Sequence, residues 1–445
     1  MISKIQFKIE ILSFYFKKNL IFFSLGIILG SLIFFYRQQL ISLAQLSAYR
    51  PKKIGLEGLY TKDNLPSEIT SLISYGLTLN SDNNKNSLSP IVKSLSIQNN
   101  NLDYLFYLYD NIYWHSGNKF TAYDIDYQIS GLKFTFVDPY QLKISSEAPF
   151  APLLSLLTKP LLKNTIGLGP YRVKKIEYQD GYVHQIVVRS PASTNDIIYR
   201  FYPSEEILIT AFKTGAVDQI SLSNLPQNML QWANAKLTQT IDANHQYSAV
   251  FFNTEKIPSK QIRQALAYAT PKTEDRNERC LGPISPNSWA YNPSIKEYPY
   301  SPAKAKEIWD KEKDSQLSSI ILSVNNRDLL ATAENIKASW KEILNLDVTI
   351  TIENRIDTQN FDAVLAYGGI PSDPDQYPFW HSLQTKTNLT KIKHAQIDKF
   401  LEEGRQTLDP LERKKIYQNF QRLLLEECPA ILLTYPTIYT VNRLK

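Results

Sequence analysis

The chain has 445 residues, which is enough for two or three domains. With 43% hydrophobic and 21% charged residues, its composition is that of a globular protein and excludes a collagenous or disordered chain. The formal charge of +6 is spread along the sequence, so we expect no nucleic-acid partner.

An apolar run near the N-terminus predicts a membrane anchor. Leu20 to Tyr36 holds 17 residues without a charge, and at about 1.5 Å per residue it spans roughly 25 Å, just enough for a bilayer core. Lysines outnumber acids before the run, so we expect the N-terminus to lie inside the cell. The predicted order is a cytoplasmic tail over 1–19, a transmembrane anchor over 20–36 and a linker over 37–52.

A cleaved signal peptide is the alternative interpretation of the same run. Ser42-Leu43-Ala44 has the small residues of a cleavage site. However, the charged region before the run is long, and Arg37 stands between the run and that site. No cysteine follows the run, so the sequence offers no lipoprotein attachment site. We therefore predict that the helix is retained as a single-pass anchor and that the main body is extracytoplasmic.

The stretch from Asp110 to Ile129 has the pattern of a strand, a tight turn and the start of a helix. Aromatic and β-branched residues at 112–114 suit a half-buried strand, and Gly117 can take the positive φ of the turn. Thr121 and Asp124 fit a capping box, so a short helix is predicted to begin after Thr121. By itself this pattern indicates a structural corner without chemistry.

Later segments predict a mixed α/β body. Thr135 to Glu147 alternates around Asp138-Pro139-Tyr140, which indicates a hairpin. A strand over 318–324, a helix over 328–344 and a strand over 348–352 predict a right-handed βαβ unit. Another strand is expected over 361–367.

Three groups of residues carry a resemblance to a known family. They are Trp114–Gly117 with Phe120–Ile125, Gly167–Val173, and Phe252–Thr254 with Ile262–Ala269. The first group resembles the W-H-D-G-x-P-[FL]-T-A-x-D-V signature of the family 5 extracellular solute-binding proteins, the oligopeptide, dipeptide and nickel receptors of ABC importers. Ser116, Lys119 and Ile125 depart from that signature. The second group resembles the family's G-T-G-P-Y segment, and the third its F-N-T and R-Q-A-[LI]-x-Y-A segments.

The resemblance implies an α/β, two-lobe, periplasmic-binding-protein type II-like fold with a hinge and a cleft. We expect the first lobe to take 53–252 plus 430–445 and the second lobe to take 253–429. The implied function is capture of peptides or a similar small solute and delivery to an ABC permease with its ATPase subunits. An anchored binding module without a transporter, such as a sensor or a surface scaffold, is the alternative.

Features of an enzyme are missing from the sequence. It contains no GxSxG, HExxH or Walker loop, and its five histidines are scattered without metal-ligand spacing. We therefore expect no catalytic residue, no metal and no cofactor, and an extracytoplasmic hydrolase is poorly supported. Cys280 and Cys428 are the two cysteines; an oxidising compartment would permit a disulfide between them, but two unpaired thiols are the prediction.

The segment from Phe361 to Trp380 is the predicted ligand site. It puts a strand end, glycines, carboxylates and aromatic residues into one loop, and clefts of α/β lobes form at the carboxyl ends of strands. It also resembles the family loop that lines the ligand pocket, and Trp289 is expected to close the opposite side. The candidate ligand-binding residues are Tyr367, Gly368, Asp373, Asp375, Tyr377, Trp380 and Trp289.

One departure in this loop bears on the ligand. The resemblance implies that an aspartate early in the loop holds the free amino group of a peptide, and Ile370 stands at that place here. A buried ammonium without a carboxylate partner is costly. Either Asp373 or Asp375 substitutes, or the ligand is not an ordinary free-amino peptide, and Asp373 is the predicted anchor.

Overall fold

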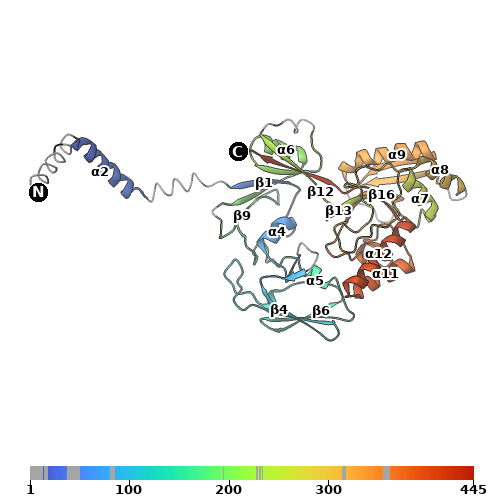
Figure 1. The fold of residues 1–445 in the computed structure, drawn as a ribbon, viewed down its shortest axis with the longest axis horizontal. Coiled ribbons are helices and arrows are strands. Elements are labelled where there is room, and N and C mark those ends of the chain that lie inside the picture. Colours follow the sequence, from blue (N-terminus) through green and yellow to red (C-terminus); the bar gives the residue numbers. More distant parts are fainter. Residues whose placement is uncertain are drawn as a thin grey trace, which may run out of the picture.

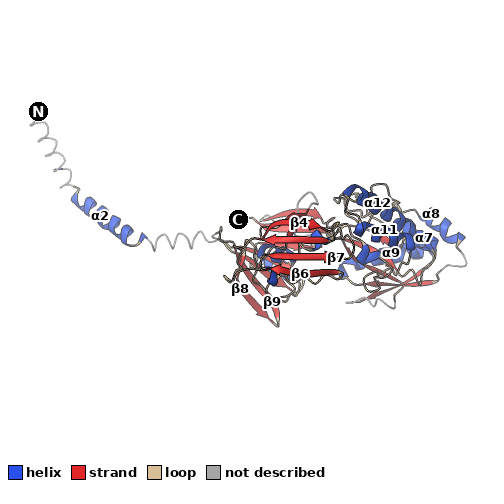
Figure 2. Ribbon diagram, turned by 90° about the horizontal axis from the view of Figure 1, so that it is seen from below, coloured by secondary structure: helices blue, strands red, loops and turns tan. Residues whose placement is uncertain are grey.

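A computed structural model gives the fold of the chain (Figure 1). It describes residues 14, 19–37, 51–80, 86–193, 195–226, 229, 232, 234–312, 317–353 and 361–444. Figure 2 shows that strands dominate the end of the body that carries β4 and β6 to β9, and that helices α7 to α9, α11 and α12 gather at the other end. The fold is therefore mixed α/β, as predicted.

The apolar run forms the helix α2, which spans Leu20–Phe35 and has 16 residues. A helix of this length measures roughly 24 Å, which is less than the ~30 Å of a bilayer core. Within the described ranges, no helix is both long enough and apolar enough to cross a membrane. The structure therefore does not support the transmembrane span predicted over 20–36. The predicted tail over 1–19 and linker over 37–52 lie mostly outside the described residues.

A seven-stranded sheet has the order β12-β18-β11-β1-β10-β9-β8. Its central strand β1 runs parallel to β10 and β11. The last strand of the chain, β18, enters antiparallel between β11 and β12. The elements are β1 (Lys52–Glu57), α4 (Ser67–Ile73), β8 (Arg172–Gln179), β9 (Tyr182–Arg189), β10 (Ile197–Tyr202), α6 (Glu205–Lys213), β11 (Gln219–Leu222), β12 (Ala235–Ile241) and β18 (Thr437–Arg443).

A four-stranded antiparallel sheet, β4-β5-β7-β6, is inserted between β1 and β8. Its strands β6 and β7 form the predicted hairpin around Asp138. Alternate residues of β5, such as Tyr104 and Phe106, pack on Trp114 and Phe120. The elements are β2 (Thr78–Asn80), β3 (Asn86–Leu88), β4 (Val92–Gln98), β5 (Asp103–Leu108), η1 (Ala122–Asp124), β6 (Leu132–Asp138), β7 (Gln141–Ser146) and α5 (Leu153–Leu156).

A five-stranded sheet, β15-β14-β16-β13-β17, contains the predicted βαβ unit, because β14 and β15 are parallel and α9 connects them. Helices α7 to α9 pack on one face, and α10 to α12 pack on the other (Figure 1). The strands are β13 (Gln246–Phe252), β14 (Ser319–Val324), β15 (Asp347–Ile352), β16 (Ala363–Gly369) and β17 (Ala430–Leu432). The helices are α7 (Lys260–Ala269), α8 (Pro302–Lys311), η4 (Arg327–Leu329), α9 (Leu330–Leu344), α10 (Tyr377–Trp380), α11 (Ala395–Gln406) and α12 (Pro410–Glu427).

The chain crosses between the seven-stranded and five-stranded sheets at two places that lie side by side. One crossing links β12 to β13, and the other links β17 to β18. The N–H of Asp242 donates to the carbonyl of Pro436 at 2.9 Å, and the N–H of Ser248 donates to the carbonyl of Thr434 at 2.8 Å. The lobe boundaries expected at 252 and 430 lie at the far end of β13 and the start of β17 rather than at these crossings.

The corner around Trp114 differs from its prediction in one respect. The N–H of Thr121 donates to the Asp124 carboxylate at 2.8 Å, and the capping box is formed. The helix is only the three-residue η1, however, because Ile125 already has an extended backbone. The predicted helix is wrong beyond Asp124: the Asp124 carboxylate also accepts from Lys163 at 2.6 Å, and Ile125 is buried in the core under the four-stranded sheet.

Two glycines of the second family-like group allow a close backbone contact. A Cβ on Gly167 would lie 2.2 Å from the carbonyl oxygen of Ile73. The N–H of Gly169 donates to the same oxygen at 2.7 Å, and the N–H of Tyr171 donates to the carbonyl of Leu72 at 3.1 Å. The segment therefore docks on the carboxyl end of α4 through backbone atoms, which requires residues without side chains.

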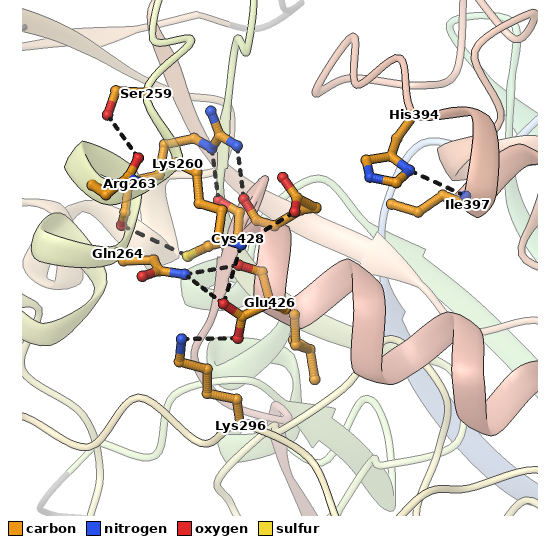
Figure 3. A network of polar contacts seen from close by, with 12 residues as sticks. Ser259, Lys260, Arg263, Gln264, Lys296, His394, Ile397, Glu426 and Cys428 are labelled. Carbon is orange, nitrogen blue, oxygen red and sulfur yellow. Dashed lines mark hydrogen bonds and ion pairs between the residues drawn. The ribbon is translucent and has the colours of Figure 1, made fainter.

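Arg263 of the third group joins the start of α7 to the end of α12. Its guanidinium is buried and donates to the carbonyls of Ile257, Glu427 and Cys428 at 2.7–3.1 Å. Figure 3 shows Arg263 and Gln264 turned toward Cys428 and Glu426. These bonds satisfy carbonyls that the end of a helix leaves without partners. Cys428 and Cys280 are both buried and free.

Gly167→Ala should lower the free energy of unfolding by about 1–3 kcal/mol, because the added methyl group meets fixed backbone atoms. Chemical denaturation measures the change. Gly282→Ala is the matched control, since its Cβ would find neighbours at an ordinary 3.5 Å, and we expect it to change stability by less than about 0.5 kcal/mol. Equal effects of the two substitutions would contradict the docking described here.

Candidate functional site

The predicted loop begins at the end of β16, next to the first crossing. Gly369 of β16 pairs with Gln246 of β13, and the N–H of Ile370 donates to the carbonyl of His245 at 2.7 Å. A Cβ on Gly368 would lie 2.5 Å from the ring of the buried Tyr247. Gly368 therefore makes room for an aromatic side chain of the neighbouring strand.

Asp373 is held by a buried arginine of α12. Both terminal nitrogens of Arg413 donate to the two carboxylate oxygens, at 2.8 and 2.5 Å. The side chains of Arg413 and Asp373 are only 7% and 12% exposed. Burial opposes the charge of Arg413, but its bonds to Asp373 raise the pKa of the guanidinium. The Arg413 Nε also donates to the carbonyl of Gly404 at 2.7 Å, so all three guanidinium nitrogens donate hydrogen bonds.

Asp375 forms an ion pair with Arg405 of α11. The Nε of Arg405 lies 3.1 and 3.0 Å from the two carboxylate oxygens, and a terminal nitrogen lies 2.9 Å from one of them. The guanidinium also lies 3.9 Å from the ring centroid of Tyr377 and 5.6 Å from that of Phe150. The carbonyl of Arg405 accepts from the N–H of Ala151 at 2.8 Å. The pair thus sits where the segment before α5 meets the helical part.

Both carboxylates of the loop therefore have bidentate partners within the protein. The anchor role predicted for Asp373 requires a carboxylate that is free to pair with a cation of the ligand, and the structure does not provide one at this position. The reason is a long-range ion pair between residues 40 positions apart, which local pattern does not reveal. A second cation brought to this carboxylate would lie next to the charge of Arg413.

The aromatic residues of the prediction fall into different environments. Trp380 is 2% exposed, packs on Phe251 and donates from its indole to Gln376 at 3.1 Å, so it is a core residue. Trp289 is half-buried, with the Arg413 guanidinium 5.5 Å from its ring centroid. Tyr377 stacks on His381 with ring centroids 4.0 Å apart. Asp373, Asp375, Tyr377 and Trp289 are thus brought together around the two arginines.

Tyr367 lies within electrostatic range of a separate group of carboxylates. Burial raises the pKa of its hydroxyl, and the charges of Asp328 and Glu205 raise it further. Glu205 begins α6, and its Oε1 accepts from the N–H and the hydroxyl of Ser223 at 2.6 and 2.7 Å. The Ser223 hydroxyl also lies 3.2 Å from Oδ2 of Asp328, in η4. This group joins the carboxyl end of β11 to the segment that follows β14.

The sequence prediction missed the residues that organise the site. They are Arg405, Arg413, Phe150, Glu205, Ser223 and Asp328. The spacing of Arg413 in the sequence does indicate that it is buried. It stands four residues before Tyr417 and seven before Phe420, on the same buried face of α12. A charged residue on the buried face of a helix requires a carboxylate partner. Within the described residues, no group of three or more His, Cys, Asp or Glu could hold a metal ion.

Comparison with known proteins identifies the family. Residues 90–390 match the bacterial extracellular solute-binding proteins, family 5 Middle. The chain belongs to this family. Its structure superposes on that of NikZ from Campylobacter jejuni in complex with Ni(L-His) with a TM-score of 0.74, at 22% identity, over 88% of this chain and 94% of that one. The predicted α/β two-lobe periplasmic-binding-protein fold is thereby confirmed.

Curated relatives of this family 5 protein are distant in sequence. It is 23% identical to heme-binding protein A of Haemophilus influenzae over 296 residues, which cover 60% of this chain. It is also 23% identical to the oligopeptide-binding protein AppA of Bacillus subtilis over 321 residues, which cover 62%. The matched regions span 54% and 57% of the two relatives' lengths.

Asp373→Asn should lower the free energy of unfolding by about 3–5 kcal/mol, because it leaves the Arg413 charge buried without its partner. Thermal or chemical denaturation measures the effect. Asp310→Asn removes the same charge from an exposed position of α8 and serves as the control. If Asp373→Asn is as stable as the control variant, the ion pair does not hold the loop.

Proposed function

We propose that this chain is the substrate-binding protein of an ABC importer, which captures a peptide or a similar small solute between its lobes and delivers it to the permease. Membership of family 5, matched over 90–390, is the observation that carries the proposal. Two of its relatives are named a heme-binding protein and an oligopeptide-binding protein. Copurification of permease and ATPase subunits would distinguish an importer from an anchored sensor or scaffold.

We place the division between the lobes at the two crossings. In this proposal the first lobe contains the seven-stranded and four-stranded sheets, and the second contains the five-stranded sheet with its helices. The segments 242–245 and 433–436 then form the hinge. The two segments are the covalent connections between the seven-stranded and five-stranded sheets, and they lie side by side. This arrangement favours a bending motion about the paired segments.

Tyr367 is the predicted residue that we retain as a ligand contact. It is half-buried at the end of β16, and it lies within electrostatic range of Glu205 and Asp328, one from each proposed lobe. Tyr377 and Trp289 supply further half-buried aromatic surface next to Arg405 and Arg413. Aromatic walls and backbone groups suit a receptor that accepts many side chains. Trp380 and Gly368 contribute through packing instead.

The arginine pairs bear on the class of ligand. A free ammonium needs a carboxylate without a partner, and Asp373 and Asp375 are each neutralised by a bidentate arginine. We therefore favour the third possibility left by Ile370, namely a ligand that does not place a free amino group in this loop. A blocked peptide or another neutral or anionic small solute fits this arrangement of charge.

A mixture of random tripeptides, half of them N-acetylated, tests the function and the ligand class together. We expect the full-length chain to retain peptides in native mass spectrometry, with the acetylated forms retained at least as well as the free-amino forms. Retention of no peptide would contradict a peptide receptor. A preference of about tenfold or more for free-amino peptides, corresponding to roughly 1.4 kcal/mol, would contradict the proposed ligand class alone.

We also propose that α2 tethers the protein to the membrane. Its apolar side chains are exposed, as shown by Phe22 at 76% and Phe35 at 82% exposure. A helix that is apolar on all sides needs an apolar surrounding, and a bilayer can thin locally around a short hydrophobic segment at modest cost. The tether would keep the receptor beside its permease.

The double substitution Leu25→Asp and Leu29→Asp should release the protein from membranes, because each charge costs about 2.5–3.5 kcal/mol in the bilayer. Fractionation followed by an alkaline wash measures the distribution. Leu411→Asp, at a position of α12 that is 72% exposed, should leave the chain with the membrane. Release of the unmodified chain by the same wash would overturn the tether.

A further inference from the structure

Basic side chains gather at one end of the seven-stranded sheet. β1 begins at that end, and the strand register places the start of β8, the end of β9, the end of β18 and the start of β12 beside it. The carboxyl end of α6 lies there too, because the carbonyl of Phe212 accepts from the side chain of Arg443, the last residue of β18. We call this surface the basic end. Its exposed basic residues are Lys52, Arg172, Lys174, Lys213 and Lys236.

The acids of this end are already bound within the protein. Among its described residues they are Asp196 and Asp218. The buried Asp196 carboxylate accepts from Arg189 at 2.8 Å and lies 3.8 Å from the Lys174 ammonium. The Asp218 carboxylate accepts from the backbone N–H of Lys53 at 3.3 Å. The basic end therefore presents an excess of positive charge to the outside.

The opposite end of the same sheet carries the opposite charge. Glu57 ends β1, and Glu205 and Glu206 begin α6. β12 ends and β18 begins at that acidic end, so it adjoins the two crossings to the five-stranded sheet. Figure 1 shows the C-terminus and β1 on the side of the body opposite α8 and α9. The basic end therefore faces away from the proposed second lobe.

The chain enters the body at the basic end, from the helix that we propose as a tether. α2 ends at Phe35, and β1 begins at Lys52. The residues between them include Arg37 and Arg50 but no acid. A segment of this length reaches at most about 60 Å. A bilayer that holds α2 would therefore keep the basic end close by, at a high effective concentration.

We propose that the basic end is a contact surface for anionic phospholipid headgroups, on which the tethered receptor rests with its second lobe turned away from the bilayer. The proposal rests on the tether proposed above, which makes even a weak surface contact effective. Lysine and arginine side chains are attracted to an anionic membrane surface within about a Debye length, and each adds to the affinity. Nucleic acid or an acidic protein would meet the same charge, but the chain itself holds neither of them beside the basic end.

Sedimentation with lipid vesicles measures this contact when binding through α2 is removed. The full-length chain carries Leu25→Asp and Leu29→Asp for this purpose. The vesicles consist either of phosphatidylcholine alone or of a mixture of phosphatidylcholine and phosphatidylglycerol. We expect the partition coefficient at low salt to be roughly tenfold higher on the anionic vesicles, and to approach the value for neutral vesicles at high salt.

Substitutions at three exposed positions test whether the basic end carries the binding. Lys52→Glu, Arg172→Glu and Lys236→Glu, introduced together, should reduce binding on anionic vesicles to the level on neutral vesicles. The neutral set Lys52→Gln, Arg172→Gln and Lys236→Gln should give an intermediate loss, and it decides the matter if the reversed variant folds poorly.

A matched control separates the position of the charges from net charge. It reverses three exposed lysines of the proposed second lobe, Lys306→Glu, Lys386→Glu and Lys415→Glu. This set changes the net charge by the same amount as the reversal at the basic end. We expect it to lower binding by less than about threefold, because its positions lie more than a Debye length from the contact.

Three results would overturn the membrane contact. They are equal losses in the two reversed sets, equal binding to both kinds of vesicle, and loss of binding on addition of inorganic phosphate at constant ionic strength. The last result would assign the basic end to a free anion.

The alkaline wash of the unmodified chain tests the tether separately. A chain that the wash retains, but whose body shows no preference for anionic vesicles, would keep the tether and lose the contact. A chain that the wash releases, but whose body prefers anionic vesicles, would support the contact and lose the tether.

Discussion

The buried ion pair between Arg413 and Asp373 is the interaction that fixes the candidate site. Arg413 stands on the inner face of α12 and is almost completely buried, so its charge needs a carboxylate partner. Asp373 meets it with two hydrogen bonds and thereby holds the loop after β16 against the helices. Two further hydrogen bonds hold the residues that follow Asp373. The N–H of Asp375 donates to the Asp373 carboxylate, and the N–H of Tyr377 donates to the Asp375 carboxylate.

This internal use of charge bears on the ligand-binding role that we propose for the loop. Its carboxylates and arginines neutralise one another, so in the proposed receptor aromatic surface and backbone groups would be left to recognise a ligand. Arg405 also contacts Phe150 and bonds to Ala151, so the loop is linked to the part of the chain that carries the four-stranded sheet. A second contact joins the end of β11 to η4, where the Ser223 hydroxyl lies 3.2 Å from Oδ2 of Asp328. Burial raises the pKa of the nearby Tyr367 hydroxyl, and the charges of Asp328 and Glu205 raise it further.

The sequence predicted features that depend on neighbours along the chain. The hairpin around Asp138, the βαβ unit over β14, α9 and β15, and the capping box of Thr121 all follow from spacing within a few residues. The family-like groups pointed to the two-lobe fold, and the structure shows their physical basis in the close approach at Gly167 and the buried fork of Arg263. The loop after β16 was located correctly as a convergence of aromatic and charged groups, but its use for ligand binding stays a prediction.

The features that were missed depend on partners distant in sequence. Nothing near Asp373 reveals that an arginine 40 residues later occupies both of its oxygens. Nothing near Ser223 reveals Asp328, which is 105 residues away. The helix expected after Thr121 stopped at Asp124 because burial of Ile125 in a separate core outweighed local helix capping. Tertiary packing and long-range ion pairs, rather than local propensity, decided these positions.

A double-mutant cycle between Arg413→Met and Asp373→Ala tests most directly whether the loop carboxylate serves the fold. The free energy of unfolding is measured for the unmodified chain, the two single variants and the double variant. We predict a coupling energy of about 2–3 kcal/mol, with the double variant more stable than the sum of the single losses allows, because it removes both charges together. A coupling energy below about 0.5 kcal/mol would show that Asp373 is energetically independent of Arg413 and would contradict this account.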